Sequence, residues 1–389
     1  MTEPDSRLRR ALLGSAGALA LAATPATPAT AATAATAATA ATAAIPTFGR
    51  PRGDWMAAWR AGWLRGCTTE NLPHVDVATL DALWDQHATV ARIGMHFHAY
   101  GSRYMPAASD LDLLQTLLDA AAARGRGIVL LGLFDDGAQP QPLWHDARRQ
   151  SAWVAGWRAF AATAAGRHPA LAGVDLLNEP HLPGQPLADA QRSWHELASR
   201  ALLALRRARC RAPVVCEPVL GAHPSALRDM PLLADPAVVY SPHFYTPHDI
   251  THQGVNAHWT QTVPYPAGAE WGLGGWDPAL GPGRIDAQRL AAELQAARDF
   301  QARHRVPVYV GEFGCVRWAP DGSAVRWVSD CIDLFAASGW NWSYHAFRAW
   351  HGWDAEIDSE QPAPGPRDAE APMVRRLRAG FAAPLRRQN

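Results

Sequence analysis

The segment that decides the fold reads Ala-Gly-Val-Asp-Leu-Leu-Asn-Glu-Pro and spans residues 172–180. It is a short apolar run that ends in an asparagine, a glutamate (Glu179) and a proline. A second segment, residues 306–314, reads Val-Pro-Val-Tyr-Val-Gly-Glu-Phe-Gly and also ends its apolar run in a glutamate, Glu312. Short apolar runs of this kind are typical of strands that are buried on both faces. Each segment is therefore predicted to be a buried strand that presents a glutamate at its carboxyl end.

The same pattern recurs along the chain after residue 50. Apolar runs alternate with longer amphipathic stretches, and this alternation is typical of βα units that form a parallel sheet. Eight strands are predicted, near residues 63–67, 90–96, 127–133, 172–178, 213–217, 237–243, 306–312 and 339–345. The predicted helices include 110–124, 147–167, 187–209, 286–304, 324–337 and a closing helix at 372–383. Eight such units predict an α/β fold of the (β/α)8 TIM-barrel type, whose active site lies at the carboxyl ends of the strands.

The two glutamates follow the fourth and the seventh predicted strands, which face each other across the mouth of a closed barrel. Two carboxyl groups about 5–5.5 Å apart can cleave a glycosidic bond with retention of configuration. One of them must carry a proton to release the leaving group, and the other must be ionised to attack the anomeric carbon. Their surroundings must therefore separate their pKa values.

Both glutamate motifs, Asn-Glu-Pro and Gly-Glu-Phe-Gly, resemble those of glycoside hydrolase family 5, a cellulase-like family of the TIM-barrel glycosidase clan. The resemblance extends over residues 55–355, and the order and spacing of the two motifs make it specific. It implies that Glu179 is the general acid/base and that Glu312 is the nucleophile. It also implies that Asn178 hydrogen-bonds the sugar 2-hydroxyl, a contact that strengthens in the transition state.

Three further residues match the family. Arg92, on the second predicted strand, is expected to keep the nucleophile ionised, because a nearby cation lowers the pKa of a carboxylate. His243 and Tyr245, in the Ser-Pro-His-Phe-Tyr segment at 241–245, match the His-x-Tyr of the sixth strand. Tyr245 is expected to donate to Glu312, and His243 to contact the sugar or the acid/base. The alternative for all three is a hydrogen-bonded polar group of the core.

Two positions depart from the family pattern. The family often has a histidine at the end of the third strand, where this chain has Phe134. It usually has a tryptophan beneath the sugar at the end of the eighth strand, where this chain has His345. Trp350 or Trp353, from the following loop, could supply the platform instead. These departures leave the glutamate pair intact but make the architecture of the sugar subsites, and hence the substrate, an open question.

Other polar residues of the predicted barrel mouth have open roles. His96 and His98 form a His-x-His, which binds metal in some hydrolases of this fold. Those enzymes carry the motif on the first strand, and many of them use a lysine ligand, whereas this chain contains no lysine. We therefore expect no metal site; the two histidines are expected to contact the substrate or to pack in the cleft, and His98 is the one assigned to the substrate. The remaining carboxylates, which could bind sugar hydroxyls or form structural ion pairs, are Glu217, Asp135 and Asp136.

The amino-acid composition argues against several classes of protein, among them nucleic-acid-binding, lysine-dependent and zinc-binding proteins. The 389 residues carry a formal net charge of zero, and a nucleic-acid-binding surface would show as a basic stripe. Without a lysine, no Schiff-base or P-loop mechanism is available. Five cysteines without a Cys-x-x-Cys or Cys/His cluster argue against zinc and are expected to be buried free thiols. Seventeen tryptophans fit both core packing and the flat platforms on which sugars stack.

The first 44 residues are predicted to be a targeting segment rather than part of the folded domain. An Arg9-Arg10 pair precedes a short apolar run that ends near Leu21, which is the pattern of an export signal. The route could be the twin-arginine or the general secretory one. An Ala/Thr/Pro-rich tract at 24–44 is expected to be a linker or part of the removed segment. The catalytic domain is predicted to span residues 45–389.

Together these features predict a secreted or periplasmic retaining β-glycoside hydrolase. The expected substrate is a β-1,4-linked glucan or mannan attacked by endo action, with the cleft formed largely by loops 244–285 and 346–358. No cofactor, nucleic-acid partner or membrane partner is expected. The protein is expected to be a monomer. The alternatives are a metal-dependent hydrolase using His96 and His98, or a sugar-binding barrel without activity.

Overall fold

The computed structural model describes residues 54–100, 103–134, 141–182, 184–275, 277 and 279–384. The predicted export segment at 1–44 lies outside these residues, and so do Asp135 and Asp136. Within the described residues, none of the helices combines the length and the apolar composition that crossing a membrane requires.

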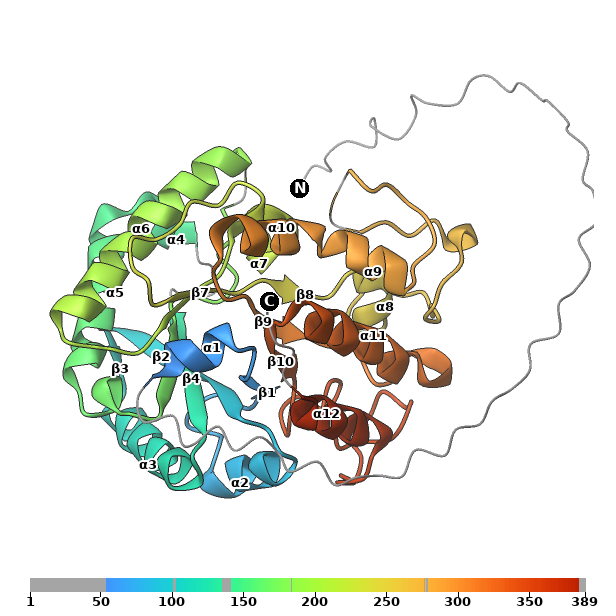
Figure 1. Ribbon diagram of the computed structural model, residues 1–389, viewed down its shortest axis with the longest axis horizontal. Helices are drawn as coiled ribbons and strands as arrows, with labels where there is room; N and C mark the ends of the chain where they lie inside the picture. Colours follow the sequence, from blue (N-terminus) through green and yellow to red (C-terminus); the bar gives the residue numbers. More distant parts are fainter. Residues whose placement is uncertain are drawn as a thin grey trace, which may run out of the picture. The chain divides into compact units, whose positions relative to one another are not determined.

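A mostly parallel sheet forms the centre of the described structure, and helices surround it (Figure 1). The strands are β1 (Arg65–Thr68), β2 (Val90–Tyr100), β3 (Arg103–Pro106), β4 (Gly127–Phe134), β5 (Leu171–Asp175), β6 (Val214–Cys216), β7 (Val238–Tyr240), β8 (His243–Phe244), β9 (Tyr309–Phe313) and β10 (Asn341–His345). Neighbouring strands follow the order β7-β6-β5-β4-β2-β1-β10-β9-β8. The sheet closes because Tyr240, the last residue of β7, forms a parallel bridge with Val308, just before β9. The predicted TIM barrel is confirmed.

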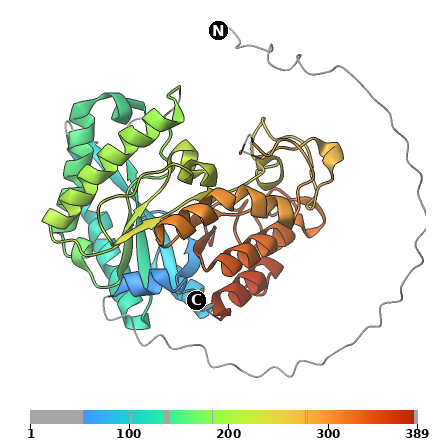
Figure 2. The same ribbon diagram turned by 45° about the horizontal axis from the view of Figure 1, so that its top comes forward.

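The helices lie between successive strands and cover the outside of the barrel (Figure 2). The α-helices are α1 (Trp55–Arg60), α2 (Val77–Asp85), α3 (Ala108–Arg124), α4 (Gln141–His145), α5 (Ala147–Ala162), α6 (Leu187–Arg207), α7 (Val219–Ala222), α8 (His248–Thr251), α9 (Ala287–Glu293), α10 (Gln295–His304), α11 (Ser323–Ser338) and α12 (Pro372–Ala382). Short 3-10 helices are η2 (Ala165–Arg167), η3 (Pro224–Leu227), η4 (Ala269–Trp271) and η5 (Pro320–Gly322).

The sixth barrel strand, predicted as one run over 237–243, is broken into β7 and β8. Pro242 lies at the break, and a proline cannot donate a hydrogen bond to a neighbouring strand. Its carbonyl still accepts from the Gly311 amide at 3.1 Å, so pairing with β9 resumes. In that pairing His243 lies directly beside Glu312. The break therefore sets the register of two residues of the predicted site.

Two other elements differ from the sequence prediction. β2 is longer than the predicted 90–96, because its outer half pairs antiparallel with β3 and gains a second row of hydrogen bonds. The predicted helix at 286–304 is two helices, α9 and α10, that meet at Leu294.

Helix α1 closes the amino-terminal end of the barrel. Trp59 of α1 is fully buried, and its indole N–H donates to the Ala172 carbonyl of β5 at 2.9 Å. The residues that pack with α1 come from successive strands: Leu64, Val90, Val129, Ala172, Val215, Val239 and Tyr309. A barrel filled in this way is a packed core rather than a pore. A substrate can therefore enter only from the opposite end, where the strands carry their carboxyl termini.

The remaining core matches two compositional expectations. All five cysteines are free and buried. Among the described residues, eight tryptophans are fully buried side chains: Trp59, Trp84, Trp153, Trp157, Trp194, Trp327, Trp340 and Trp342. Trp350 and Trp353 are among the described tryptophans that are not buried.

The side chain of Asn341, at the start of β10, joins three segments at the closed end, and its replacement tests how much this junction contributes. Its amide donates to the Trp59 and Val308 carbonyls at 2.8 and 3.1 Å, and its oxygen accepts from the Leu64 amide at 3.0 Å. We expect Asn341→Ala to lower the free energy of unfolding by about 2–3 kcal/mol, because these buried groups lose their partner. Urea denaturation followed by tryptophan fluorescence measures the change.

The matched control is Asn256→Ala, because the exposed Asn256 side chain accepts one hydrogen bond from the His258 amide. An equal shift in both variants would show that Asn341 is not a structural junction.

Candidate active site

A pocket of about 260 Å³ lies at the carboxyl ends of the strands. Six of its lining residues were predicted to belong to the site: Glu179, His243, Tyr245, Glu312, His345 and Trp353. The others are Leu220, Gly221, His223, Thr246, His248 and His252. Two larger hollows, of about 490 and 550 Å³, lie beside α1, and their described lining contains no carboxylate. Of these three pockets, the one at the barrel mouth is therefore the one whose described lining contains carboxylates.

Arg92 of β2 organises the base of this pocket. Its guanidinium is fully buried and forms ion pairs with three carboxylates. Nη1 lies 2.5 Å from Glu312 Oε1, Nη2 lies 2.8 Å from Glu217 Oε1, and Nε and Nη2 both donate to Asp175 Oδ2 at 3.1 and 3.0 Å. The planar fork of an arginine can serve three acceptors at once, whereas an ammonium group has no such fixed geometry.

Glu312 is the more enclosed of the two predicted catalytic glutamates. Its side chain is 12% exposed, and Tyr245 donates to its Oε2 at 3.0 Å. Burial alone would raise the pKa of Glu312, but the charges of His243, His345 and Arg92 outweigh burial and lower it. Glu312 is therefore held as a carboxylate.

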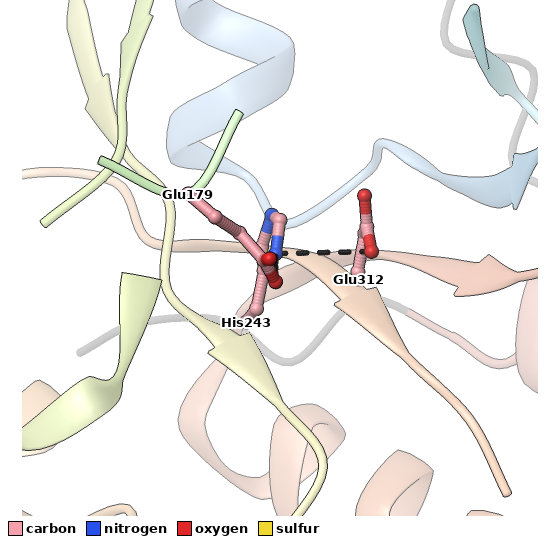
Figure 3. A group of neighbouring side chains, drawn as sticks. All are labelled: Glu179, His243 and Glu312. Atoms are coloured by element: carbon pink, nitrogen blue, oxygen red, sulfur yellow. Dashed lines mark hydrogen bonds and ion pairs between the residues drawn. The ribbon is translucent and has the colours of Figure 1, made fainter. Parts of the chain in front are cut away.

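Glu179 is more accessible, with a side chain that is 41% exposed. Its backbone has φ of 46°, in the left-handed region that a residue other than glycine rarely adopts. The amide of Glu179 donates to Glu217 Oε2 at 2.6 Å, which helps to hold this conformation. A carboxylate oxygen of Glu179 lies within 4.8 Å of one of Glu312. Figure 3 shows His243 between the two glutamates.

His243 connects the carboxylates. Its Nδ1 lies 2.9 Å from Glu179 Oε1 and 3.8 Å from Glu312 Oε2, and its Nε2 lies 3.2 Å from Glu217 Oε1. Burial would lower the pKa of His243, but the negative charges of Glu217 and Glu312, together with hydrogen bonds to Glu179 and Glu217, raise it well above its usual value. The ring therefore lies between acceptors, and its Nδ1 is close enough to Glu179 Oε1 for the two groups to share a proton.

The other predicted residues lie at different distances from this centre. Asn178 Oδ1 is 3.4 Å from Arg92 Nη2. His345 Nδ1 is 3.6 Å from Glu312 Oε2, and its ring contacts Trp353 edge-on at 5.6 Å.

The described residues that line the pocket do not include Trp350 or His98. Trp350 is 39% exposed and packs against Trp353. His98 lies on the outer half of β2, between His96 and Tyr100, in the part that pairs with β3.

Phe134 has a packing role at the end of the third barrel strand. Its ring stacks on Phe97 at 4.4 Å and contacts Trp153 and Trp157. The position where the family often has a histidine is therefore part of an aromatic cluster.

Several site residues could not be assigned from the sequence. Asp175 is fully buried, and within the described residues its Oδ1 has no hydrogen-bond partner. Burial and the neighbouring Glu217 raise its pKa, against the influence of Arg92. A carboxylate inside the apolar run of residues 171–177 was the available signal, because such a side chain needs a buried partner. Glu217, left open above, belongs to the same buried group.

Three histidines outside the barrel strands, His223, His248 and His252, form part of the pocket wall. His248 and His252 are four residues apart at α8, and their rings lie 4.4 Å apart. Burial lowers the pKa of His248 to about 4, and burial together with the nearby His248 and His345 lowers that of His252 to about 3. Burial also lowers the pKa of His223 to about 4. Neutral imidazoles of this kind can both donate to and accept from hydroxyl groups.

The capacity for metal binding is concentrated in the same centre. Among the described residues, Glu179, His243 and Glu312 are the three whose potential ligand atoms all lie within 4.8 Å of one another. His96 and His98 are not part of that group. A cation there would compete with Arg92, Tyr245 and His243 for the same carboxylate oxygens.

The model of the family "Cellulase (glycosyl hydrolase family 5)" matches residues 64–350 of this chain. The chain belongs to glycoside hydrolase family 5. It is therefore a glycosidase that hydrolyses glycosidic bonds in β-glycans. Endoglucanase C of Acetivibrio thermocellus is 26% identical over 253 residues, which cover 60% of this chain and 69% of that relative. Endoglucanase C307 of Clostridium sp. (strain F1) matches to the same extent.

Solved structures share the fold at low sequence identity. A glycoside hydrolase superposes with a TM-score of 0.66 at 21% identity and covers 81% of this chain and 98% of its own. Endoglucanase Cel5A from the hyperthermophilic Thermotoga maritima superposes with a TM-score of 0.64 at 18% identity, covering 82% and 98%.

Replacing Arg92 tests the electrostatic balance of the site. Arg92→Met leaves Glu217 and Glu312 in the interior without their cation. We expect the free energy of unfolding to fall by about 3–5 kcal/mol, as when one partner of a buried ion pair is removed. The loss should shrink in acid, where the carboxylates become protonated. Denaturant titrations at neutral and acidic pH measure both effects.

The control is Arg284→Met, which breaks an exposed pair with Asp286 and should cost less than about 1 kcal/mol. Equal stability of the two variants would contradict this account of Arg92.

Proposed function

We propose that this glycosidase acts by a double displacement with retention of configuration, with Glu312 as nucleophile and Glu179 as general acid/base. The observation that carries the proposal is the separation of the two carboxylates, whose oxygens come within 4.8 Å of each other. Retaining enzymes have carboxyl groups about 5–5.5 Å apart, whereas inverting enzymes leave about 6.5–9.5 Å for a water molecule.

The surroundings of each glutamate suit its proposed step. Glu312, kept ionised by Arg92 and by the Tyr245 hydroxyl, attacks the anomeric carbon while Glu179 gives its proton to the departing glycosidic oxygen. A covalent glycosyl–Glu312 ester results. Glu179, now ionised, takes a proton from water, the water oxygen attacks the anomeric carbon, and the ester bond breaks. The greater exposure of Glu179 gives both the leaving group and the water access to it.

We propose a β-1,4-linked glucan or mannan as the substrate, cleaved by endo action. The names of the two curated relatives, both endoglucanases, support this substrate class. Trp353 lines the pocket and the exposed Trp350 extends the aromatic surface beyond it, as a polymer substrate requires. Purified enzyme assayed on β-glucans, mannans and aryl glycosides, with viscosity followed against reducing ends, tests both the sugar and the mode of attack.

We further propose that the chain is exported. The Arg9-Arg10 pair with its apolar run supports this proposal, as does a polymer substrate that cannot enter a cell. Cell fractionation with and without residues 1–44 tests it.

The anomeric configuration of the first product tests the retaining mechanism. We expect proton NMR early in the reaction to show the β-anomer, which then mutarotates. Glu312→Gln should abolish turnover on every substrate, because no nucleophile remains. An initial α-anomer, or full activity of Glu312→Gln, would refute the mechanism, and activity lost on EDTA treatment would favour a metal-dependent hydrolase.

The leaving group tests the role of Glu179. We expect Glu179→Ala to slow hydrolysis of unactivated glycosides by about 10²–10⁴-fold, the usual contribution of general acid–base catalysis. Formation of the glycosyl-enzyme from an aryl glycoside with an acidic phenol should be far less affected, because such a phenolate departs without a proton. Single-turnover kinetics on the two substrate types measure the difference.

Glu196→Ala, an exposed position on α6, is the control and should behave as wild type. Equal losses of Glu179→Ala on the two substrate types would exclude Glu179 as the acid.

A further inference from the structure

Glu217 lies behind the pocket, immediately after β6, and its side chain is fully buried. Within the described residues it is not part of the pocket lining. Its position is fixed from behind, because the Trp194 indole donates to the Glu217 carbonyl at 2.7 Å. A buried carboxylate is costly unless its oxygens are satisfied, so the partners of Glu217 indicate what it does.

Three hydrogen-bond donors converge on this one carboxylate. Oε1 accepts from Arg92 Nη2 at 2.8 Å and lies 3.2 Å from His243 Nε2. Oε2 accepts from the Glu179 backbone amide at 2.6 Å. Each of these donors also serves a predicted catalytic glutamate: Arg92 binds Glu312, His243 contacts Glu179, and the amide is that of Glu179 itself.

Only an acceptor without hydrogens fits this arrangement. An ionised carboxylate accepts on both oxygens, whereas an amide of the same shape replaces one oxygen with an NH₂ donor. Glutamine at position 217 would therefore turn an N–H group toward Arg92 and His243 or toward the Glu179 amide. The same contact fixes the ring of His243, because an acceptor at Nε2 requires a proton on that nitrogen. Nδ1 is then left facing Glu179, where a proton can be shared.

The contact with the Glu179 amide has a separate effect. The left-handed backbone at Glu179 is disfavoured for a side chain of this kind, by roughly 1–2 kcal/mol per residue. A short hydrogen bond that the Glu179 amide donates to a fixed, charged acceptor opposes relaxation of that backbone. The direction in which the Glu179 carboxylate points into the pocket therefore depends on Glu217.

We propose that Glu217 is a positioning residue of this glycosidase, whose carboxylate holds Arg92, His243 and the Glu179 backbone in the geometry that both catalytic glutamates need. The proposal rests on the roles given to Glu179 and Glu312 above. Glu217 acts through these neighbours and does not itself touch the sugar.

The charge of Glu217 gives the proposal a second consequence. The charged or titratable groups around His243 are Arg92, Asp175, Glu179, Glu217, Glu312 and His345. Removing the negative charge of Glu217 makes loss of the proton shared by Glu179 and His243 easier. The alkaline limb of the pH–rate profile should then move to lower pH.

Glu217→Gln and Glu217→Asp separate these effects. We expect Glu217→Gln to lower kcat about 100-fold, the scale of a small misplacement of reacting groups, with little change in KM. Unlike the loss in Glu179→Ala, this loss should extend to glycosyl-enzyme formation from activated aryl glycosides, because Arg92 and hence Glu312 are disturbed too. The alkaline limb of the pH–rate profile of Glu217→Gln should move to lower pH. Glu217→Asp, which keeps the charge but has a shorter reach, should show an intermediate kcat and a wild-type limb.

Glu293→Gln is the matched control. Glu293 of α9 is equally buried and accepts from Arg289 at 2.9 Å and from the Asp277 amide at 3.3 Å, but it is not among the described residues of the pocket lining. This variant should lose stability and keep the wild-type kcat and pH profile. Circular dichroism and thermal unfolding of all variants show which are folded.

A folded Glu217→Gln with wild-type kcat, or with an unshifted alkaline limb, would overturn the proposal. If Glu217→Gln does not fold, Glu217→Asp decides: a reduced kcat supports the proposal, and a wild-type kcat overturns it. Glu312→Gln distinguishes failure of the positioning role of Glu217 from failure of the proposed function. If it is inactive while Glu217→Gln is wild type, only the positioning role fails. If it is fully active, the proposed function fails as well.

Discussion

The contact between the Arg92 guanidinium and three buried carboxylates is the constraint on which the rest of the site depends. Its partners come from separate parts of the barrel: Asp175 from β5, Glu217 from the end of β6, and Glu312 from β9. These groups meet only if the sheet closes with the observed register. Burying them gains little stability by itself, because desolvation offsets most of the attraction. What the arrangement provides is a fixed, polar base for the pocket.

The site divides into a charged base and an uncharged wall. Arg92 and its carboxylates lie at the base, whereas His248 and His252 in the wall have low pKa values and are neutral near pH 7. A charged base favours reactions that develop charge at the anomeric carbon. A neutral wall of imidazoles and an indole suits hydroxyl groups and the apolar faces of sugars.

The sequence was sufficient to predict the barrel and the meeting of Glu179 and Glu312 in one pocket, because both signals are local. An apolar run followed by Asn-Glu-Pro predicts, within one short segment, a strand, the point where it ends and the carboxylate at that end. Pro242 is the sequence signal for the break in the sixth strand, which is predicted as one run over 237–243. Asp175 and Glu217 could not be assigned in the same way. Their roles depend on which side chains of several strands point to the same place, and this depends on the register of the closed sheet.

The left-handed backbone at Glu179 has a consequence for how such a protein changes over evolutionary time. Glycine and asparagine occupy this conformation with less strain than glutamate. Under the proposed role of Glu179, a lineage released from selection for hydrolysis would therefore gain stability by replacing this acid/base with glycine or asparagine. The strain of this backbone conformation thus favours inactive, sugar-binding descendants, and under the proposed mechanism only selection for turnover opposes this.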